Sequence, residues 1–276
     1  MKIDNTSMNN KERAGRFTSS EVYNLIPYGK VTMTDSELIE FKKLNPKSKA
    51  KTRAGGFQKS GETYIQEKIY ERRMKSTLDG DAYSQSMAWG NIMESYLYTI
   101  IGTEYEMTSK STTLHPIYGE FWSGSADMLI KEFSLVKVIS EIKCYGKKGF
   151  AGYVDTMMKA KEKQDVSIFR DAYPKEYWQI VSNACIHDAP EGEVMAFMPY
   201  ESEYPEIKEM VENLEDSDIW KYRFIVEKPI KNLPFLPDDG YYENVNTYRF
   251  EIPEADKVFL TKRLIEANKI LSGASV

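Results

Sequence analysis

Two acidic residues and a lysine near the middle of the chain combine types and spacing that suit phosphodiester chemistry. Asp127 falls in one predicted strand, and Glu141 and Lys143 fall in the next, with Ile142 between them. Because side chains alternate between the two faces of a strand, Glu141 and Lys143 point the same way. If the turn lies near residues 131–134, the strands form a hairpin in which Asp127 comes close to opposite Glu141.

A pair of carboxylates placed in this way can share one hard divalent ion such as Mg²⁺, since facing Cβ atoms lie about 4.5–5.5 Å apart. Such an ion activates water and neutralises the charge that develops on a phosphate. A lysine beside it can orient or deprotonate the water, or stabilise the transition state. An ordinary ion pair on a hairpin is the alternative interpretation.

A second Glu-x-Lys, residues 206–208, lies in an acidic, helix-like stretch and has no predicted strand partner, so it is not a candidate site.

A third acidic residue lies within a predicted apolar helix at residues 84–101. At helical spacing Glu94 falls in an apolar row. The other members of that row are Met87, Gly90, Leu97 and Ile101. A carboxylate in such a row needs a partner, which would be a metal ion or a basic side chain. The alternative is a helix exposed enough for Glu94 to reach water.

The elements that would position these residues form an α/β pattern with a β core. Ser19 and Ser20 precede a short predicted helix as N-cap residues do, and residues 27–60 are predicted to be loop. Further helices are predicted at 62–78, 84–101, 174–186 and 253–271. Strands are predicted within 111–144 and at 193–200, 220–228 and 246–252. The sequence therefore predicts one α/β domain over residues 1–276, with a central mixed sheet flanked by helices.

Composition excludes several classes of protein. The chain has 276 residues, of which 41% are apolar and 29% are charged, so a buried core is expected. It has no apolar run of about 18 residues and no apolar segment near its start, which argues against a membrane span or a secretory signal. Two cysteines are too few for a disulfide framework or a four-cysteine metal site, and a reducing cytoplasm is expected. His115 and His187 are too few for histidine-based chemistry and are interpreted as structural.

Charge is distributed unevenly along a chain whose net charge is −5. Residues 41–60 hold seven Lys or Arg and no acid, whereas residues 201–219 hold eight acids and one Lys. Such asymmetry can make one face cationic, which suits a DNA partner. A solvated surface loop is the alternative interpretation of residues 41–60, and the role of this segment stays open.

Four short blocks, taken in order, resemble one family of nucleases. They are Arg13-Ala-Gly-Arg-Phe-Thr-Ser-Ser20-Glu-Val, Trp89-Gly90-x-x-x-Glu94, Gly124-Ser125-Ala126-Asp127 followed by Glu141-Ile142-Lys143-Cys144, and Tyr177-Trp178-Gln179. Together these blocks resemble the lambda-type phage alkaline exonucleases, or YqaJ-like viral recombinases, of the PD-(D/E)XK nuclease superfamily. The resemblance spans about residues 12–185, and residues 193–271 match only in general pattern. Ala126 stands where the family often has Pro, and Val181 where many relatives have a second Gln.

The resemblance implies a metal site and its surroundings. Asp127, Glu141 and the Ile142 carbonyl would hold Mg²⁺, with Mn²⁺ as a possible substitute. Lys143 would act on the attacking water. Glu94 would support the metal site or a second ion.

The resemblance also implies a role for the blocks at the two ends. Gln179 would lie beside the active site and help to position it. Arg13 and Ser20 would hold the 5′-phosphate of a DNA end, and a guanidinium fork and a hydroxyl suit that role.

The implied activity is Mg²⁺-dependent 5′→3′ digestion of linear double-stranded DNA to 5′-mononucleotides. It would leave 3′ overhangs for recombination with a single-strand annealing protein, and relatives form ring-shaped trimers. A PD-(D/E)XK endonuclease is one alternative, but it has no need of the Arg13 and Ser20 anchor. A RecB-type or Cas4-type nuclease is another, although Cas4 members need four cysteines. A non-catalytic DNA-binding subunit is the third, and the intact Asp127, Glu141 and Lys143 argue against it.

Overall fold

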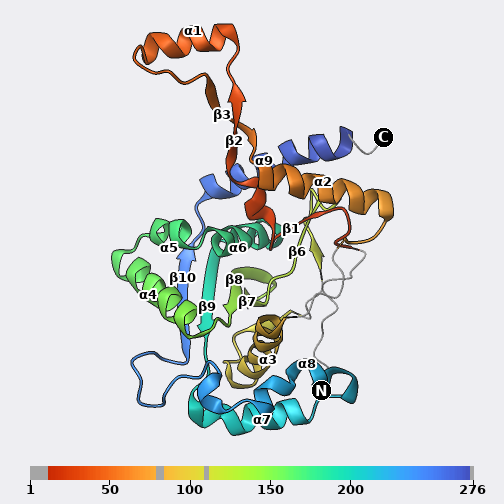
Figure 1. Ribbon diagram of the computed structural model, residues 1–276, viewed down its shortest axis with the longest axis vertical. Helices are drawn as coiled ribbons and strands as arrows, with labels where there is room; N and C mark the ends of the chain where they lie inside the picture. The colour runs from red at the N-terminus through yellow and green to blue at the C-terminus, as the bar shows by residue number, and fades with distance from the viewer. Residues whose placement is uncertain (1–11, 79–83, 109–111, 274–276) are drawn as a thin grey trace.

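A mixed five-stranded sheet forms the centre of the computed structural model, which describes residues 12–78, 84–108 and 112–273 (Figure 1). The strands lie in the spatial order β10 (Val245–Glu251), β9 (Glu191–Phe197), β8 (Leu135–Lys143), β7 (Met128–Glu132) and β4 (Glu106–Met107). β8 and β9 run parallel, and the other neighbours are antiparallel. The predicted α/β fold with a central mixed sheet is therefore confirmed.

Alternating side chains of this sheet enter two separate hydrophobic cores, one on each face. Val194 and Ala196 of β9 belong to one core, and Met195 and Phe197 belong to the other. The first face is covered by α4 (Lys147–Lys163), α5 (Val166–Ala172), α6 (Pro174–His187) and α9 (Glu254–Gly273). The second face is covered by α3 (Gln85–Ile100), α7 (Tyr204–Glu212) and α8 (Asp216–Glu227). Burial of both faces explains why residues 194–197 of β9 are all apolar.

A small three-stranded sheet lies beside the central one. Its strands are β1 (Phe17–Thr18), β6 (Trp122–Gly124) and β5 (Thr113–Leu114), with β6 in the middle and β1 parallel to it. Short 3₁₀ helices lie at η1 (Val22–Leu25), η2 (Glu201–Glu203) and η3 (Ile230–Asn232). The short helix after Ser20 is therefore present, but its N-cap is Glu21 and no side chain caps it. The expectation that Ser19 or Ser20 caps this helix was wrong.

Most of residues 27–60, predicted to be loop, instead form a projecting arm at residues 28–57. The arm consists of the antiparallel strands β2 (Tyr28–Thr32) and β3 (Thr52–Phe57), with α1 (Asp35–Leu44) between them. It extends from the body beside α2 (Lys59–Met74) and α9 (Figure 1). A capping box between Thr34 and Glu37 begins α1. No residue of α1 is buried, so the apolar periodicity on which the sequence prediction depended is weak here.

The other main correction concerns residues 220–228, which were predicted to be a strand, whereas residues 220–227 lie in α8. Their aromatic and β-branched residues favour strands in isolation. In the structure Tyr222 and Ile225, three residues apart, are both buried in the core shared with α3 and α7. Tertiary packing of one helical face therefore decided the conformation of this segment.

The remaining predicted elements are confirmed, with small shifts in their ends. α2, α3, α6 and α9 match the predicted helices, and α6 has a proline in its first turn. The strand prediction for residues 111–144 holds for β5 to β8, although residue 111 lies outside the described residues. Both cysteines are free. No helix among the described residues is long and apolar enough to cross a membrane.

Candidate active site

The β7–β8 hairpin places the two predicted carboxylates opposite each other. Met128 pairs with Ser140, so the next residue of each segment, Asp127 and Glu141, lies at the adjoining position, and the two carboxylates interact. The predicted turn near residues 131–134 is confirmed, because Glu132 pairs with Leu135 across a two-residue turn.

Asp127 differs from the prediction in one respect, since it directly precedes β7 and is not part of it. Its Oδ2 accepts a hydrogen bond of 2.8 Å from the backbone N–H of Ile142. The N–H and C=O of a strand residue point to the same side, so the Ile142 carbonyl also faces the Asp127 side of β8.

The Glu141 carboxylate is fully buried and is clasped by two amides from one helix. Asn183 Nδ2 donates to Glu141 Oε1 at 2.5 Å, and Gln179 Nε2 donates to Glu141 Oε2 at 2.6 Å. Both amides lie on α6 one helical turn apart, and therefore on the same face of that helix. Lys143 Nζ donates to Gln179 Oε1 at 3.3 Å and lies 3.7 Å from Glu141 Oε2. Gln179 thus links the lysine to the glutamate.

Electrostatics at this site favour a bound cation. Burial and the adjacent Asp127 charge raise the pKa of Glu141 well above its ordinary value. Burial alone would lower the pKa of Lys143, but the carboxylates of Glu141 and Asp127 outweigh it and raise that pKa. The oxygen donors at Asp127 and Glu141 are of the kind that Mg²⁺ prefers, and a cation between them would offset their repulsion. The residues present therefore fit a magnesium ion.

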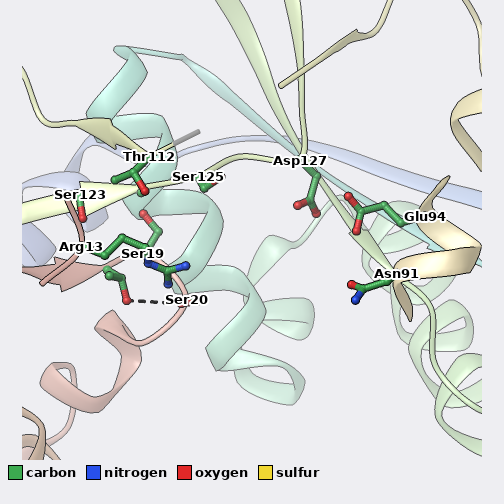
Figure 2. A pocket seen from close by; sticks show the side chains of 11 residues that line it. Arg13, Ser19, Ser20, Asn91, Glu94, Thr112, Ser123, Ser125 and Asp127 are labelled. Atoms are coloured by element: carbon green, nitrogen blue, oxygen red, sulfur yellow. Dashed lines mark hydrogen bonds between the residues drawn. The ribbon is translucent and has the colours of Figure 1, made fainter. Parts of the chain in front are cut away.

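Glu94 approaches this site from α3. Figure 2 shows its carboxylate pointing toward Asp127. Tyr98 Oη donates to Glu94 Oε1 at 2.7 Å. Burial and the charges of Glu94 and Asp127 raise the pKa of Tyr98, so its hydroxyl keeps the proton that it donates. Within the described parts of the chain, no three His, Cys, Asp or Glu side chains form a metal-binding group.

One cavity joins the acidic residues to the predicted phosphate anchor. It has a volume of about 220 Å³, and its lining includes Arg13, Ser20, Glu94 and Asp127. In Figure 2 Arg13 and Ser20 lie on one side of the cavity, and the two acids lie on the other. Ser123 also lines the cavity, and its buried hydroxyl has no hydrogen-bond partner among the described residues. One wall thus offers a cation and hydroxyl donors, whereas the opposite wall offers carboxylates.

The backbone that carries Arg13 is fixed by α2. Gly15 N–H donates to Glu71 Oε2 at 2.8 Å, and Arg72 Nε donates to the Gly15 carbonyl at 3.0 Å. Glu71 is itself buried in an ion pair with Lys68 at 2.9 Å. Gly15 has φ +70°, and a Cβ there would lie 2.3 Å from Arg72 Cγ. A larger residue at position 15 would therefore displace the segment that presents Arg13.

Close packing of α6 against β6 brings the two halves of the site together. A Cβ at Gly124 would lie 2.2 Å from both Asn183 Oδ1 and Ser19 Oγ, so only glycine fits this crossing. Ser19 Oγ hydrogen-bonds Ser182 Oγ at 2.8 Å. Trp122 Nε1 also donates to Ser182, at 2.8 Å.

The predicted site residues thus form two adjoining groups: Arg13, Ser20, Glu94 and Asp127 line the cavity, and Glu141, Lys143 and Gln179 interact with one another beside Asp127. Sequence reasoning missed two of their partners. Asn183 clasps Glu141, and its only signal in the sequence is its place four residues after Gln179. Tyr98 lies four residues after Glu94 on α3, and its hydroxyl donates a hydrogen bond to the Glu94 carboxylate. His115 is structural as expected, since its Nδ1 accepts the backbone N–H groups of Ile117 and Tyr118, whereas the structural role of His187 stays a prediction.

Comparison with known proteins shows likeness in structure. No protein-family model and no curated protein matches the sequence. The solved structure of LHK-Exo in complex with dAMP superposes with a TM-score of 0.55 at 15% identity, over 95% of this chain and 91% of that one. An alkaline exonuclease, LHK-Exo from Laribacter hongkongensis, gives 0.50 at 15% identity, over 94% and 91%. A phage-related exonuclease from Haemophilus somnus 129PT gives 0.51 at 12% identity, over 93% of each chain. The chain therefore has the fold of the alkaline exonucleases.

Proposed function

We propose that this protein is a Mg²⁺-dependent exonuclease that digests linear double-stranded DNA from a 5′ end. It would release 5′-mononucleotides and leave 3′ overhangs. The observation that carries this proposal is the single cavity in which Arg13 and Ser20 face Asp127 and Glu94. A terminal phosphate on one wall would bring the neighbouring phosphodiester toward the carboxylates on the other.

Two further findings support the proposal. The fold is shared with alkaline exonucleases across nearly the whole chain. One of these structures, LHK-Exo, contains dAMP, a deoxynucleoside monophosphate, which is the class of product proposed for this chain. A nuclease that released such products would need to hold a phosphate beside a hydrolytic site, and the cavity offers both.

Asp127, Glu141 and the Ile142 carbonyl would hold the magnesium ion, with Glu94 supporting the site from α3. When bound, Mg²⁺ supplies neutralisation of phosphate charge and acidification of water. The protein contributes the fixed position of the donors. Asn183 and Gln179 hold both oxygens of Glu141, and the Ile142 N–H holds one oxygen of Asp127. Neither carboxylate needs to rearrange during the reaction, which lowers the reorganisation cost.

Lys143 would orient the attacking water and stabilise negative charge on the phosphate. Burial alone would lower the pKa of Lys143, but the charges of Glu141 and Asp127 raise it, so before a metal ion binds its ammonium is protonated and donates hydrogen bonds. Gln179 accepts from Lys143 and donates to Glu141, and this arrangement sets the spacing of the two groups. Gln179 and Asn183 are therefore positioning residues.

Arg13 and Ser20 would supply specificity for a chain end. A guanidinium group and a hydroxyl bind the additional charge of a terminal phosphate better than that of an internal phosphodiester. The hold of Glu71 and Arg72 on Gly15 keeps Arg13 at the cavity. Entry of a DNA end, and not of a continuous duplex, would then be favoured.

The test is digestion of linear duplex DNA labelled at one 5′ or one 3′ end, with Mg²⁺ or with EDTA and with covalently closed circles in parallel. We expect Mg²⁺-dependent release of mononucleotides from 5′-phosphorylated ends and no cutting of circles. Glu141→Ala and Lys143→Ala should abolish release. The matched controls Glu206→Ala and Lys208→Ala, in the Glu-x-Lys of α7, should not change it.

Other outcomes would favour the alternative functions. Cleavage of closed circles would indicate an endonuclease. DNA binding without Mg²⁺-dependent cleavage of any substrate would indicate a non-catalytic binding subunit and would overturn the proposal.

By the same family resemblance we propose a homotrimer around DNA and a single-strand annealing protein as partner. Light scattering of the purified protein would test the trimer, and co-purification would test the partner.

A further inference from the structure

The β2–α1–β3 arm, residues 28–57, is a feature that the proposed catalytic site does not use. Five strand residues at about 3.3 Å each carry the arm roughly 17 Å along β2, and α1 crosses its tip (Figure 1). All of α1 is exposed or half-buried, and Leu44 at its end is 84% exposed. The arm therefore offers a surface that the body of the protein does not cover.

The root of the arm is held rigidly, although its tip is exposed. Arg263 of α9 is 1% exposed and lies between two aromatic rings, with its guanidinium carbon 4.5 Å from the Tyr28 centroid and 4.0 Å from the Phe57 centroid. It donates to the carbonyls of Leu25 at 2.8 Å and Gly56 at 2.9 Å. One buried arginine therefore fixes both strands of the arm to the body.

The charge of the arm is opposite to that of the whole chain. It has seven basic and three acidic residues, a net charge of +4 in a chain whose total is −5. The basic residues are Lys30, Lys42, Lys43, Lys47, Lys49, Lys51 and Arg53, and all are exposed. Among the described residues, Arg53 alone of the seven has an acidic partner, Glu37 at 2.9 Å. The acidic stretch at 201–219 lies around α7 and α8, at the opposite end of the molecule (Figure 1).

We propose that this arm binds the phosphate backbone of duplex DNA outside the catalytic cavity. The inference rests on the proposed function, because it identifies a second contact with the same DNA. The lysines of the arm are clustered, exposed and without acidic partners among the described residues, and the residues between them are mostly small or polar. Such side chains suit the phosphates of DNA, which are bound without reading the base sequence. A second copy of the chain would instead need complementary burial of apolar surface, and the exposed apolar side chains of α1 are scattered between charges.

The path of the chain couples the arm to the phosphate anchor. Ser20 is separated from Tyr28 only by η1 and a short connection. Leu25 of η1 is buried and accepts from Arg263, so anchor and arm belong to one packed unit. DNA held by the arm would therefore keep its end near Arg13 between successive cleavage steps, which would raise processivity.

The test compares a triple variant of the arm, Lys47→Gln with Lys49→Gln and Lys51→Gln, with a matched control. The control is Lys159→Gln with Lys161→Gln and Lys163→Gln, which removes three equally spaced, exposed lysines from α4. Binding to a 5′-phosphorylated duplex of about 30 base pairs, roughly three turns, is measured in EDTA at several salt concentrations. We expect the arm variant to weaken binding by roughly 10-fold or more and to reduce the salt slope by about three. The control should change neither as much.

Cleavage assays separate this proposal from the proposed function. With Mg²⁺, the arm variant should release the first nucleotide at a saturating rate equal to that of the wild type, but release fewer nucleotides for each binding event. If the wild-type protein cleaves DNA and the arm variant binds as tightly as the wild type, the arm proposal fails and the nuclease stands. If the wild-type protein fails to cleave but binding depends on the arm lysines, the nuclease fails and the arm proposal stands.

Two other results would overturn the arm proposal. Equal weakening by both triple variants would show a general effect of charge. If light scattering showed that the arm variant has a different oligomeric mass from the wild type, while each oligomer bound DNA as tightly as before, the arm would contact a second copy of the chain and not DNA.

Discussion

The site around Glu141 and the arm at residues 28–57 use charge in opposite ways. Glu141 is 0% exposed, and both of its oxygens have a fixed amide donor. The seven basic side chains of the arm are exposed to water, and of these seven described residues only Arg53 has an acidic partner. A buried charge depends on every partner, because any unpaired group bears the full desolvation cost. Exposed charges are screened by salt and contribute in small, nearly additive steps.

This difference predicts how each region responds to mutation. Loss of the Glu141 charge should abolish most of the activity at any salt concentration, and loss of either amide that holds it should raise the Mg²⁺ requirement. Loss of single charges on the arm should produce graded effects that disappear as salt is raised. The experiments below test this contrast, from the largest expected effect to the smallest.

Glu141→Gln should have the largest effect. It keeps the size of the side chain but removes the negative charge that faces Lys143 and Asp127, and we expect cleavage to fall by roughly 10³-fold. The thermal midpoint should change by less than about 4 °C, because removing the repulsion by Asp127 offsets the one amide hydrogen bond that the –NH₂ group of the new side chain, itself a donor, cannot accept. Single-turnover cleavage and thermal melting measure the two effects. Glu206→Gln, in the exposed Glu-x-Lys of α7, is the matched control. If low salt restored part of the activity of Glu141→Gln, the buried site would respond to salt as the exposed arm does, and the contrast between the two regions would be contradicted.

Asn183→Ala and Gln179→Ala should have intermediate effects. Each removes one hydrogen bond to Glu141, so the carboxylate loses orientation but stays in place. We expect the Mg²⁺ concentration for half-maximal cleavage to rise by about 10- to 100-fold. DNA binding in EDTA should be unchanged. A wild-type Mg²⁺ titration for both variants would mean that the clasp on Glu141 has no role beyond packing.

Arg13→Ala should have a smaller and more selective effect. Loss of a charge-assisted contact to the terminal phosphate should reduce the rate on 5′-phosphorylated ends by about 10-fold. The rate on 5′-hydroxyl ends serves as the internal control and should stay unchanged. Comparison of initial rates on the two substrates measures the ratio, and an equal fall on both would show that Arg13 supports the cavity without reading the phosphate.

Arg263→Lys should have the smallest effect on DNA. A lysine cannot stack between Tyr28 and Phe57 while donating to both backbone carbonyls, so the root of the arm should loosen. We expect the affinity for duplex DNA at low salt to fall by roughly two- to three-fold, because all seven basic residues of the arm remain. Thermal melting should show a fall of a few degrees, roughly 2–4 °C per kcal/mol lost. Lys262→Arg, at the exposed neighbouring position, is the control.

The chemistry of the candidate site could be predicted from local sequence because strand geometry is local. The alternation of side chains along β8 and the position of the turn were sufficient to place Asp127 opposite Glu141. Glu94 stood out because it interrupts an apolar helical row, and a period of 3.6 residues is also local. Asn183 was missed because its role depends on the crossing of α6 over β6, and Gly124 gives no sign of which helix will approach it.

The arm and α8 show where local pattern was insufficient. In α8 the strand propensity of residues 220–228 was overridden by burial of one helical face against α3 and α7. In the arm, α1 buries no residue, so its helix is specified by the Thr34–Glu37 cap and not by apolar periodicity. By itself the sequence determined the residue types, the hairpin and most helices, because these follow from periods of two and 3.6 residues. Only the tertiary structure brought the Arg13 segment, α3, β6 and Asp127 around one cavity and set α6 against Glu141, since contacts between distant segments depend on how the faces of the sheet are covered.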